Sequence, residues 1–207
     1  MLHRMIRVFF RAAVLFAGTA LPALAHHVMD YAQPATALEG LLSGLGHPVI
    51  GVDHLLFIAG TGVLAARFER GYRLPLAFVL ASIAVAGMRY LGVDVGLGEL
   101  WIAGSLVVLG AFMLVAGAPG QGVTVGLFLA AGALHGYALA EAIVGAERTP
   151  LAAYLVGLAV IQSAIALAAW WIAGWVARHW PRVPLQRLSG AAVAIAGIAF
   201  AGMAAFG

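Results

Sequence analysis

Long apolar stretches alternate with short polar or Pro/Gly-rich segments along most of the chain. Each stretch is close to the ~20 residues that an α-helix needs to cross ~30 Å of hydrocarbon at ~1.5 Å per residue. The pattern predicts six transmembrane helices, over residues 48–66, 74–91, 98–117, 123–143, 151–176 and 185–206. The segments between them are too short to hold a second domain. We therefore expect an all-α, polytopic membrane protein with a single six-helix transmembrane domain.

The composition agrees with this pattern. Of the 207 residues, 64% are hydrophobic and only 9% are charged, whereas a soluble domain carries about a quarter charged residues. This argues against a soluble enzyme, a disordered tail and a nucleic-acid-binding domain. There is no cysteine, which excludes disulfides, thiolate metal sites and cysteine nucleophiles.

The first 25 residues have the layout of a secretory signal peptide. A basic region over 1–11 is followed by an apolar run over 14–21 and by an Ala-x-Ala pattern that ends at Ala25. Cleavage after Ala25 would leave a mature domain over 26–207 that opens with a short periplasmic leader, 26–47; an uncleaved signal anchor is the alternative. Removing the signal takes three of the 11 basic residues and no acid, leaving eight against eight. The net charge of +3 therefore belongs to the export signal.

The arginines predict the orientation of the helices, because cytoplasmic loops of membrane proteins are enriched in Lys and Arg. With the mature N-terminus outside, six arginines fall on the cytoplasmic side and two on the outer side; the six are Arg67, Arg70, Arg73, Arg178, Arg182 and Arg187, and the two are Arg89 and Arg148. The sequence thus predicts a bacterial inner-membrane protein with both mature termini in the periplasm.

Glycines recur within the predicted spans. Gly122 with Gly126, and Gly132 with Gly136, form small-xxx-small pairs on the fourth span. Such pairs let helix backbones approach closely in lipid. We expect both pairs to serve compact packing.

Ionisable residues at the start of the first span are the clearest candidates for function. The segment reads His47-Pro48-Val-Ile-Gly-Val-Asp53-His54. A charged group at the centre of a span costs about 2.5–3.5 kcal/mol on insertion scales, so each one suggests a site. Because Pro48 suits a first helical turn, we expect His47 to cap the helix at its outer mouth. Asp53 and His54 would then lie roughly 10 Å deeper, and the seven-residue spacing places His54 on about the same face as His47.

The fourth span runs in the opposite direction and carries His135 and Glu141. Counting from its outer end, Glu141 lies at the mouth and His135 about two turns deeper. We therefore expect His135 to share one depth with His54. Glu99 begins the third span, also at the outer mouth, where pairing with Arg89 is an alternative role for it.

Imidazole and carboxylate groups together suit Ni²⁺, Co²⁺ or Zn²⁺. Asp53 could ligate a metal directly or orient a histidine. Cleavage after Ala25 would also leave a free α-amine beside His26 and His27, a chelating group that could capture metal at the periplasmic face.

The His47-Pro-x-x-Gly-x-Asp-His54 element, within a small six-helix protein behind a signal peptide, resembles the HupE/UreJ family of nickel and cobalt permeases. The resemblance covers essentially the whole mature chain. It implies a role in metal uptake for His47, Asp53 and His54 and, through a looser match, for Glu99, His135 and Glu141. The family usually has Met four residues after the second histidine, where this chain has Ile58, and this departure leaves the preferred metal open.

The leading hypothesis is a permease, not an enzyme, that moves Ni²⁺ or Co²⁺, with Zn²⁺ and Cu²⁺ as further substrates that the residues allow. No Gly-x-x-x-x-Gly-Lys-Ser/Thr phosphate loop is present, so transport would be facilitated or coupled to an ion gradient or a partner. The opposite orientation of spans one to three and four to six suggests a 3+3 inverted arrangement. The polar residues Thr61, Ser82, Gln162 and Ser163 could line an exit route.

Three other functions stay open. A haem protein would use His54 and His135 as axial ligands. A membrane metalloenzyme would use a His/Asp zinc site, although no His-Glu-x-x-His element supports it. An assembly factor for a metalloenzyme would bind metal or a maturation partner without transporting it, and a homo-oligomer is compatible with each function.

Overall fold

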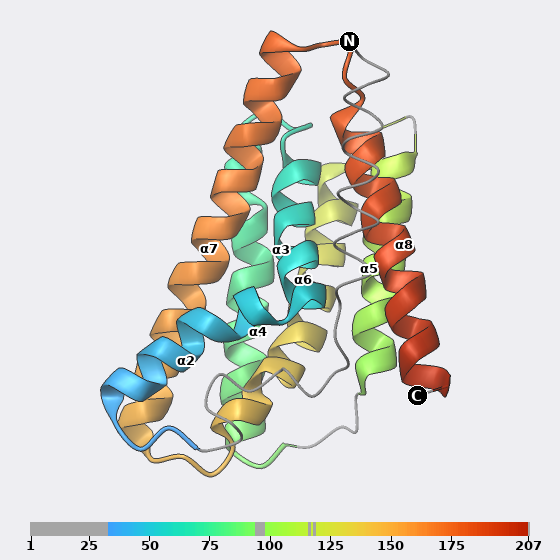
Figure 1. The fold of residues 1–207 in the computed structure, drawn as a ribbon. Coiled ribbons are helices and arrows are strands. Elements are labelled where there is room, and N and C mark those ends of the chain that lie inside the picture. Colours follow the sequence, from blue (N-terminus) through green and yellow to red (C-terminus); the bar gives the residue numbers. More distant parts are fainter. Residues whose placement is uncertain (1–32, 94–97, 116, 118, 207) are drawn as a thin grey trace.

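The computed structural model describes residues 33–93, 98–115, 117 and 119–206, and the regular structure of these residues is entirely helical (Figure 1). The helices are α2 Ala37–Ile50, α3 Val52–Ala65, α4 Pro75–Tyr90, α5 Glu99–Leu114, α6 Gln121–Leu139, α7 Arg148–His179 and α8 Leu185–Phe206, with two short 3-10 helices, η2 Gly71–Arg73 and η3 Ala140–Ile143. This confirms the all-α prediction. The predicted signal peptide, 1–25, lies outside the described residues.

Several of these helices suit a bilayer. Among the described residues, four continuous helical segments are long and apolar enough to cross a membrane: η2 with α4, α6 with η3, α7, and α8. The bent pair of α2 and α3 would make a fifth span. The remaining apolar helix, α5, has 16 residues and would cover only about 24 Å of the ~30 Å hydrocarbon core. The protein is therefore a helical membrane protein with four or five clear spans, and the sixth span stays a prediction.

The first predicted span is not one straight helix. It consists of α2 and α3, which meet at Gly51 with a bend of 79°. The expectation that His47 caps a helix beginning at Pro48 is wrong, because α2 begins at Ala37 and Pro48 lies inside it. Most of the predicted leader that the structure describes is thus helical.

Local interactions explain both ends of α2. Thr36 and Glu39 form a capping box, in which each side chain accepts a hydrogen bond from the backbone N–H of the other residue, and this starts the helix. Near the other end, Pro48 has no N–H to donate and disrupts the helical ladder. Gly51 then takes an extended conformation, with φ −71° and ψ 96°. The chain starts α3 from there in a new direction.

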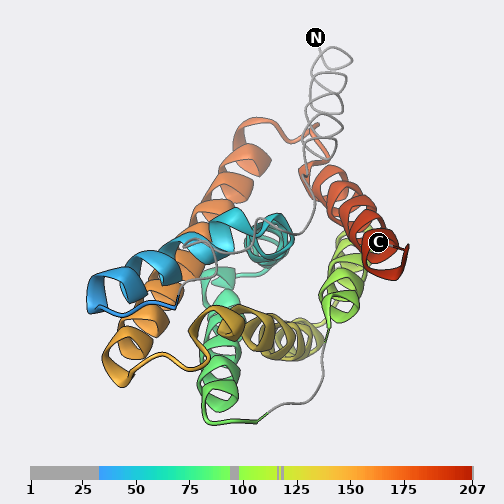
Figure 2. The same cartoon turned by 60° about the horizontal axis from the view of Figure 1, so that its bottom comes forward.

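The helix α3 is central to the bundle. It contacts α2, α4, α5, α7 and α8, and Figure 2 shows it between α7 on one side and α8 with α5 on the other. The most extensive helix pairs are α5 with α8, α2 with α7, and α4 with α6. Side chains on α3 are therefore surrounded by helices from both halves of the chain.

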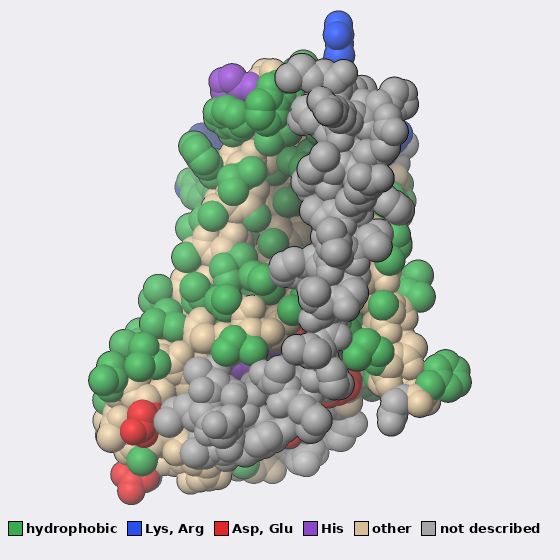
Figure 3. All heavy atoms as spheres, viewed as in Figure 1, with side chains coloured by type: hydrophobic (Ala, Val, Ile, Leu, Met, Phe, Trp, Pro, Cys, Tyr) green, Lys and Arg blue, Asp and Glu red, His purple; other side chains and the backbone are tan. Residues whose placement is uncertain are grey.

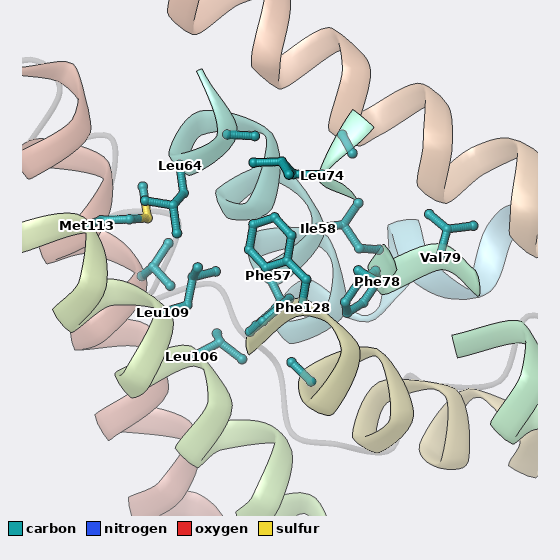
Figure 4. Packing of buried hydrophobic residues seen from close by; sticks show 14 of the residues in the cluster. Phe57, Ile58, Leu64, Leu74, Phe78, Val79, Leu106, Leu109, Met113 and Phe128 are labelled. Carbon is teal, nitrogen blue, oxygen red and sulfur yellow. The ribbon is translucent and has the colours of Figure 1, made fainter. Parts of the chain in front are cut away.

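Aromatic and aliphatic side chains fill the interior beside α3 (Figure 4). Phe57 of α3 stacks on Phe78 of α4 with ring centroids 5.3 Å apart. Phe128 of α6 and Leu109 and Met113 of α5 belong to the same buried cluster. Close packing of this kind is the main attraction between helices in lipid, so the cluster holds α3, α4, α5 and α6 together.

Charged side chains are segregated along the bundle. On the face shown in Figure 3, the acidic side chains lie at the lower end, where α2 begins, and the arginines lie at the upper end. The separation of arginines from most acids, which the sequence predicts, is therefore present in the fold. By the positive-inside rule, the arginine-rich end would face the cytoplasm.

The two predicted glycine pairs of α6 have different surroundings. A Cβ atom on Gly132 or Gly136 would lie 2.4 or 2.1 Å from a backbone oxygen of α4, so the two helices touch backbone to backbone there. A Cβ atom on Gly122 or Gly126 would meet no described atom within 4 Å. The packing role is confirmed for Gly132 and Gly136, whereas no described residue packs against Gly122 or Gly126.

We predict that Gly136→Ala lowers the melting temperature of the purified protein by at least about 5 °C, because α4 must move away to admit the methyl group. Gly126→Ala, which is the same change on the same helix, is the control and leaves the melting temperature unchanged or slightly raised. Equal melting temperatures for the two variants would refute the close contact of α4 and α6.

Candidate metal site

Three histidines lie together at the bend between α2 and α3. His47 is in the last turn of α2, His54 in the first turn of α3, and His135 near the end of α6. Their exposed fractions are 4%, 4% and 0%. The Nδ1 atoms of His54 and His135 are 2.8 Å apart, and the ring centroids of His47 and His54 are 6.0 Å apart. The three side chains form one buried imidazole cluster.

The bend brings two of these rings together. On a straight helix, residues seven apart are separated by roughly 10 Å along the axis, which is the spacing that the sequence predicts for His47 and His54. Because the chain turns by 79° at Gly51, their rings are close enough to pack edge to face. The common depth predicted for His54 and His135 is confirmed by their contact.

Hydrogen bonds determine which nitrogen of His135 carries the proton. Ser105 of α5 donates its hydroxyl proton to the backbone oxygen of Ile102, at 2.7 Å. In the 3.0 Å contact between Ser105 Oγ and His135 Nε2, the imidazole N–H must therefore be the donor. A neutral His135 then has its lone pair on Nδ1 and accepts a hydrogen bond from His54 Nδ1–H. The lone pair of a neutral His54 is consequently on Nε2.

Tyr154 determines the tautomer of His47 by the same logic. This fully buried side chain of α7 donates its hydroxyl proton to the backbone oxygen of Leu139 at the end of α6. Its 3.1 Å contact with His47 Nδ1 therefore uses the ring N–H as the donor, and a neutral His47 has its lone pair on Nε2. Tyr154 thus joins α2, α6 and α7 and orients one member of the cluster.

The side of the cluster that faces the core is apolar. The ring of His135 lies 4.6 Å from that of Phe57 and 5.5 Å from that of Phe78, centroid to centroid. Buried polar groups are costly unless they are hydrogen-bonded, and both nitrogens of His135 are. The aromatic rings exclude water from this side of the histidine pair.

Asp53 lies beside the histidine pair at the start of α3. It is half-buried, and its Oδ1 accepts a hydrogen bond from the backbone N–H of His54 at 2.8 Å. A carboxylate in the first turn of a helix is favoured by the unpaired N–H groups there. Its charge is also close enough to interact with His135. The carboxylate could therefore hold or attract a cation at this position.

The other predicted carboxylates lie on the surface, whereas the three histidines are buried. Glu99 and Glu141 are both exposed. Arg89, the predicted partner of Glu99, instead donates to the backbone oxygen of Tyr137 at 2.7 Å and lies over its ring.

The six predicted metal residues are therefore not all gathered at one point. No group of three or more His, Asp or Glu side chains is arranged to hold a metal ion within the part of the chain that the structure describes. His26 and His27, the predicted capture residues, lie outside that part.

Two residues of the site, Ser105 and Tyr154, are absent from the set predicted from the sequence. Each is a hydroxyl-bearing residue in an otherwise apolar span, which is the signal that could have identified it. That signal is weak, because Ser and Tyr in membrane helices commonly bond to their own or a neighbouring backbone.

A known protein family covers most of the chain. A family model described as HupE / UreJ protein matches residues 14–200. Protein HupE of Rhizobium leguminosarum bv. viciae is 32% identical over 130 residues, which are 59% of this chain and 65% of that protein. The match thus spans slightly less than two thirds of that relative. No solved structure gives a significant match to the chain.

We predict that Ser105→Ala releases the tautomer of His135, because the variant lacks the acceptor for Nε2–H. Long-range ¹⁵N–¹H correlation spectra of histidine-labelled protein would report the proton on Nε2 in the wild type and a mixture of tautomers in Ser105→Ala. Ser105→Thr keeps the hydroxyl and should restore the wild-type pattern. The assignment of donor and acceptor is wrong if Ser105→Ala retains a single Nε2–H form.

Proposed function

Because the chain belongs to the HupE/UreJ family, we propose that it is a permease that moves Ni²⁺ or Co²⁺ across the bacterial inner membrane. The observation that supports this best is the buried pair of His54 and His135, whose Nδ1 atoms are 2.8 Å apart in the interior of the bundle. Two neutral imidazoles at this depth are suited to hold a divalent cation that has lost part of its water shell.

The pair is close enough for both nitrogens to bind one ion after a small movement. The hydrogen bond between the rings holds the Nδ1 atoms at 2.8 Å, whereas two nitrogens at ~2.0–2.1 Å from one metal ion are about 2.9 Å apart at 90° and about 3.4 Å apart at the tetrahedral angle. Imidazole suits Ni²⁺, Co²⁺ and Zn²⁺ alike, so the proposed preference for Ni²⁺ or Co²⁺ rests on the family.

Metal binding needs only a small rearrangement of protons. His135 already carries its proton on Nε2, where Ser105 accepts it. When His54 moves its proton from Nδ1 to Nε2, the Nδ1 atoms of both histidines have a lone pair available to the ion. Asp53 at the start of α3 would supply the negative charge, either as a ligand or by attraction across a water molecule.

The acidic end of the bundle would collect the cation. The exposed carboxylates Glu99 and Glu141 raise the local concentration of cations there. His47 lies at the bend between this surface and the histidine pair. We propose that these residues pass the ion inward one after another, with His26 and His27 as an earlier point of capture at a periplasmic N-terminus.

Alternating access would follow from a 3+3 inverted arrangement. If the two halves are related, α3 corresponds to α6, α4 to α7, and α5 to α8. The contact of α3 with α7 then corresponds to that of α6 with α4, and the contact of α3 with α8 corresponds to that of α6 with α5. The pair of α5 and α8 corresponds to itself. All of these pairs are in contact, which supports two related halves that rock against each other. The relation is partial, because α3 also packs on α5 while the described residues of α6 and α8 form no comparable contact.

A haem is the less suitable ligand for the same histidines. Two axial nitrogens on opposite faces of a haem iron would be about 4 Å apart, twice a metal–nitrogen bond of ~2.0 Å. The pair of His54 and His135 is closer and is already hydrogen-bonded. An assembly factor that binds Ni²⁺ or Co²⁺ without moving it is the alternative that uptake measurements distinguish.

We predict that cells producing the wild-type protein accumulate ⁶³Ni²⁺ or ⁵⁷Co²⁺, and that His54→Ala, His135→Ala and Asp53→Asn each lower the initial uptake rate at least tenfold. The variants lose ligands or charge at the buried pair. His179→Ala is the matched control, because His179 is exposed and stacks on Trp175 at the arginine-rich end; it should transport like wild type. Equal accumulation by wild type and all variants would contradict the proposal.

A further inference from the structure

A buried amide in the middle of the bundle has an unused oxygen. Gln162 of α7 is completely buried, and its Nε2 donates to Ser82 Oγ of α4 at 3.1 Å. Its Oε1 has no hydrogen-bond partner among the described residues. A buried acceptor without a partner destabilises a fold, and an apolar residue of similar size would remove that cost. The presence of Gln162 is therefore not explained by packing.

This amide lies next to the histidine pair, on the side toward the arginine-rich end. The helices α3 and α7 run in the same direction (Figure 1), and a Cβ atom on Gly62 would touch the backbone oxygen of Ala166. Gln162 comes one turn before Ala166, and Ile58 comes one turn before Gly62, so Gln162 and Ile58 lie at the same level. Ile58 is about 6 Å along α3 from His54. Gln162 is therefore about 6 Å farther than His54 toward the arginine-rich end. Ser82 is in backbone contact with Gly136, the residue after His135.

Other directions from the histidine pair are less suitable for a cation. Toward α5, the buried Leu109 fills the space, and the stacked rings of Phe57 of α3 and Phe78 of α4 lie against His135. At the arginine-rich end, a cavity of about 330 Å³ between α3, α7 and α8 is lined by Arg67 and Arg187. Both guanidinium groups are positively charged, so this cavity repels cations.

We propose that Gln162 Oε1 and Ser82 Oγ form a second, weaker station for the divalent cation on its way from the histidine pair to the arginine-rich end. This inference rests on the proposed permease function. Neutral oxygen donors bind Ni²⁺ and Co²⁺ less tightly than imidazole does. A weak station after a stronger one allows the ion to leave, as conduction requires. From this station the ion would move toward the arginine-rich end along the contact of α4 and α7.

The test separates binding of the metal from its movement. Wild type, Gln162→Leu and Ser82→Ala are compared for equilibrium binding of ⁶³Ni²⁺ to purified protein, for initial uptake into cells and for melting temperature. The control is Gln121→Leu, the same change at the exposed start of α6. Gln162→Leu should bind Ni²⁺ like wild type, melt at the same or a higher temperature, and lose at least tenfold in maximal uptake rate with little change in KM. Ser82→Ala should lose maximal rate in the same way, and Gln121→Leu should match wild type throughout.

Each other outcome overturns the inference. Uptake by Gln162→Leu at the wild-type rate would mean that the oxygen is not on the route. A lower melting temperature together with weaker Ni²⁺ binding would give Gln162 a structural role. If the wild-type protein takes up neither metal, the proposed function is refuted, and this inference with it. If wild type and Gln162→Leu take up metal equally, only the inference is refuted.

Discussion

The requirement that buried imidazole rings be hydrogen-bonded is the constraint on which the site depends. Three histidines are enclosed in a bundle of low polarity, where an unpaired polar group is costly. Ser105 and Tyr154 have already donated their own protons to backbone oxygens, so each can only accept from a histidine. Both residues therefore fix a tautomer: His135 has its lone pair on Nδ1, next to His54, and His47 has its lone pair on Nε2.

The break in the first span allows the histidines to meet in this cluster. On a straight helix, His47 and His54 would be separated by roughly 10 Å along the axis. The bend at Gly51 brings their ring centroids to within 6.0 Å of each other. Breaks of this kind occur in membrane transporters where the backbone is enclosed by protein. Here α2 is enclosed in part by α7, since Gly44 is in backbone contact with Tyr154, and the same contact positions the tyrosine that binds His47.

Periodicity and composition were sufficient for the parts of the fold that depend on long apolar runs. The predicted span 185–206 coincides with α8, and the equal depth of His54 and His135 follows from counting residues along antiparallel spans. The bend could not be predicted in this way, because Pro48 is equally suited to a helix start, and the deciding capping box at Thr36 and Glu39 lies in a stretch that looks like a polar leader. Whether Glu99 and Glu141 face the solvent depends on the rotation of each helix about its own axis. The apolar pattern of these helices does not determine that rotation.

The account centres on metal coordination by His54 and His135, and X-ray absorption at the nickel edge of the Ni²⁺-loaded, purified protein tests this most directly. We predict two imidazole nitrogens at about 2.1 Å in the wild-type protein, with the imidazole signal reduced in His54→Ala and absent in the double variant with His135→Ala. Coordination by oxygen alone in the wild type, or a spectrum that the two substitutions leave unchanged, would contradict the account.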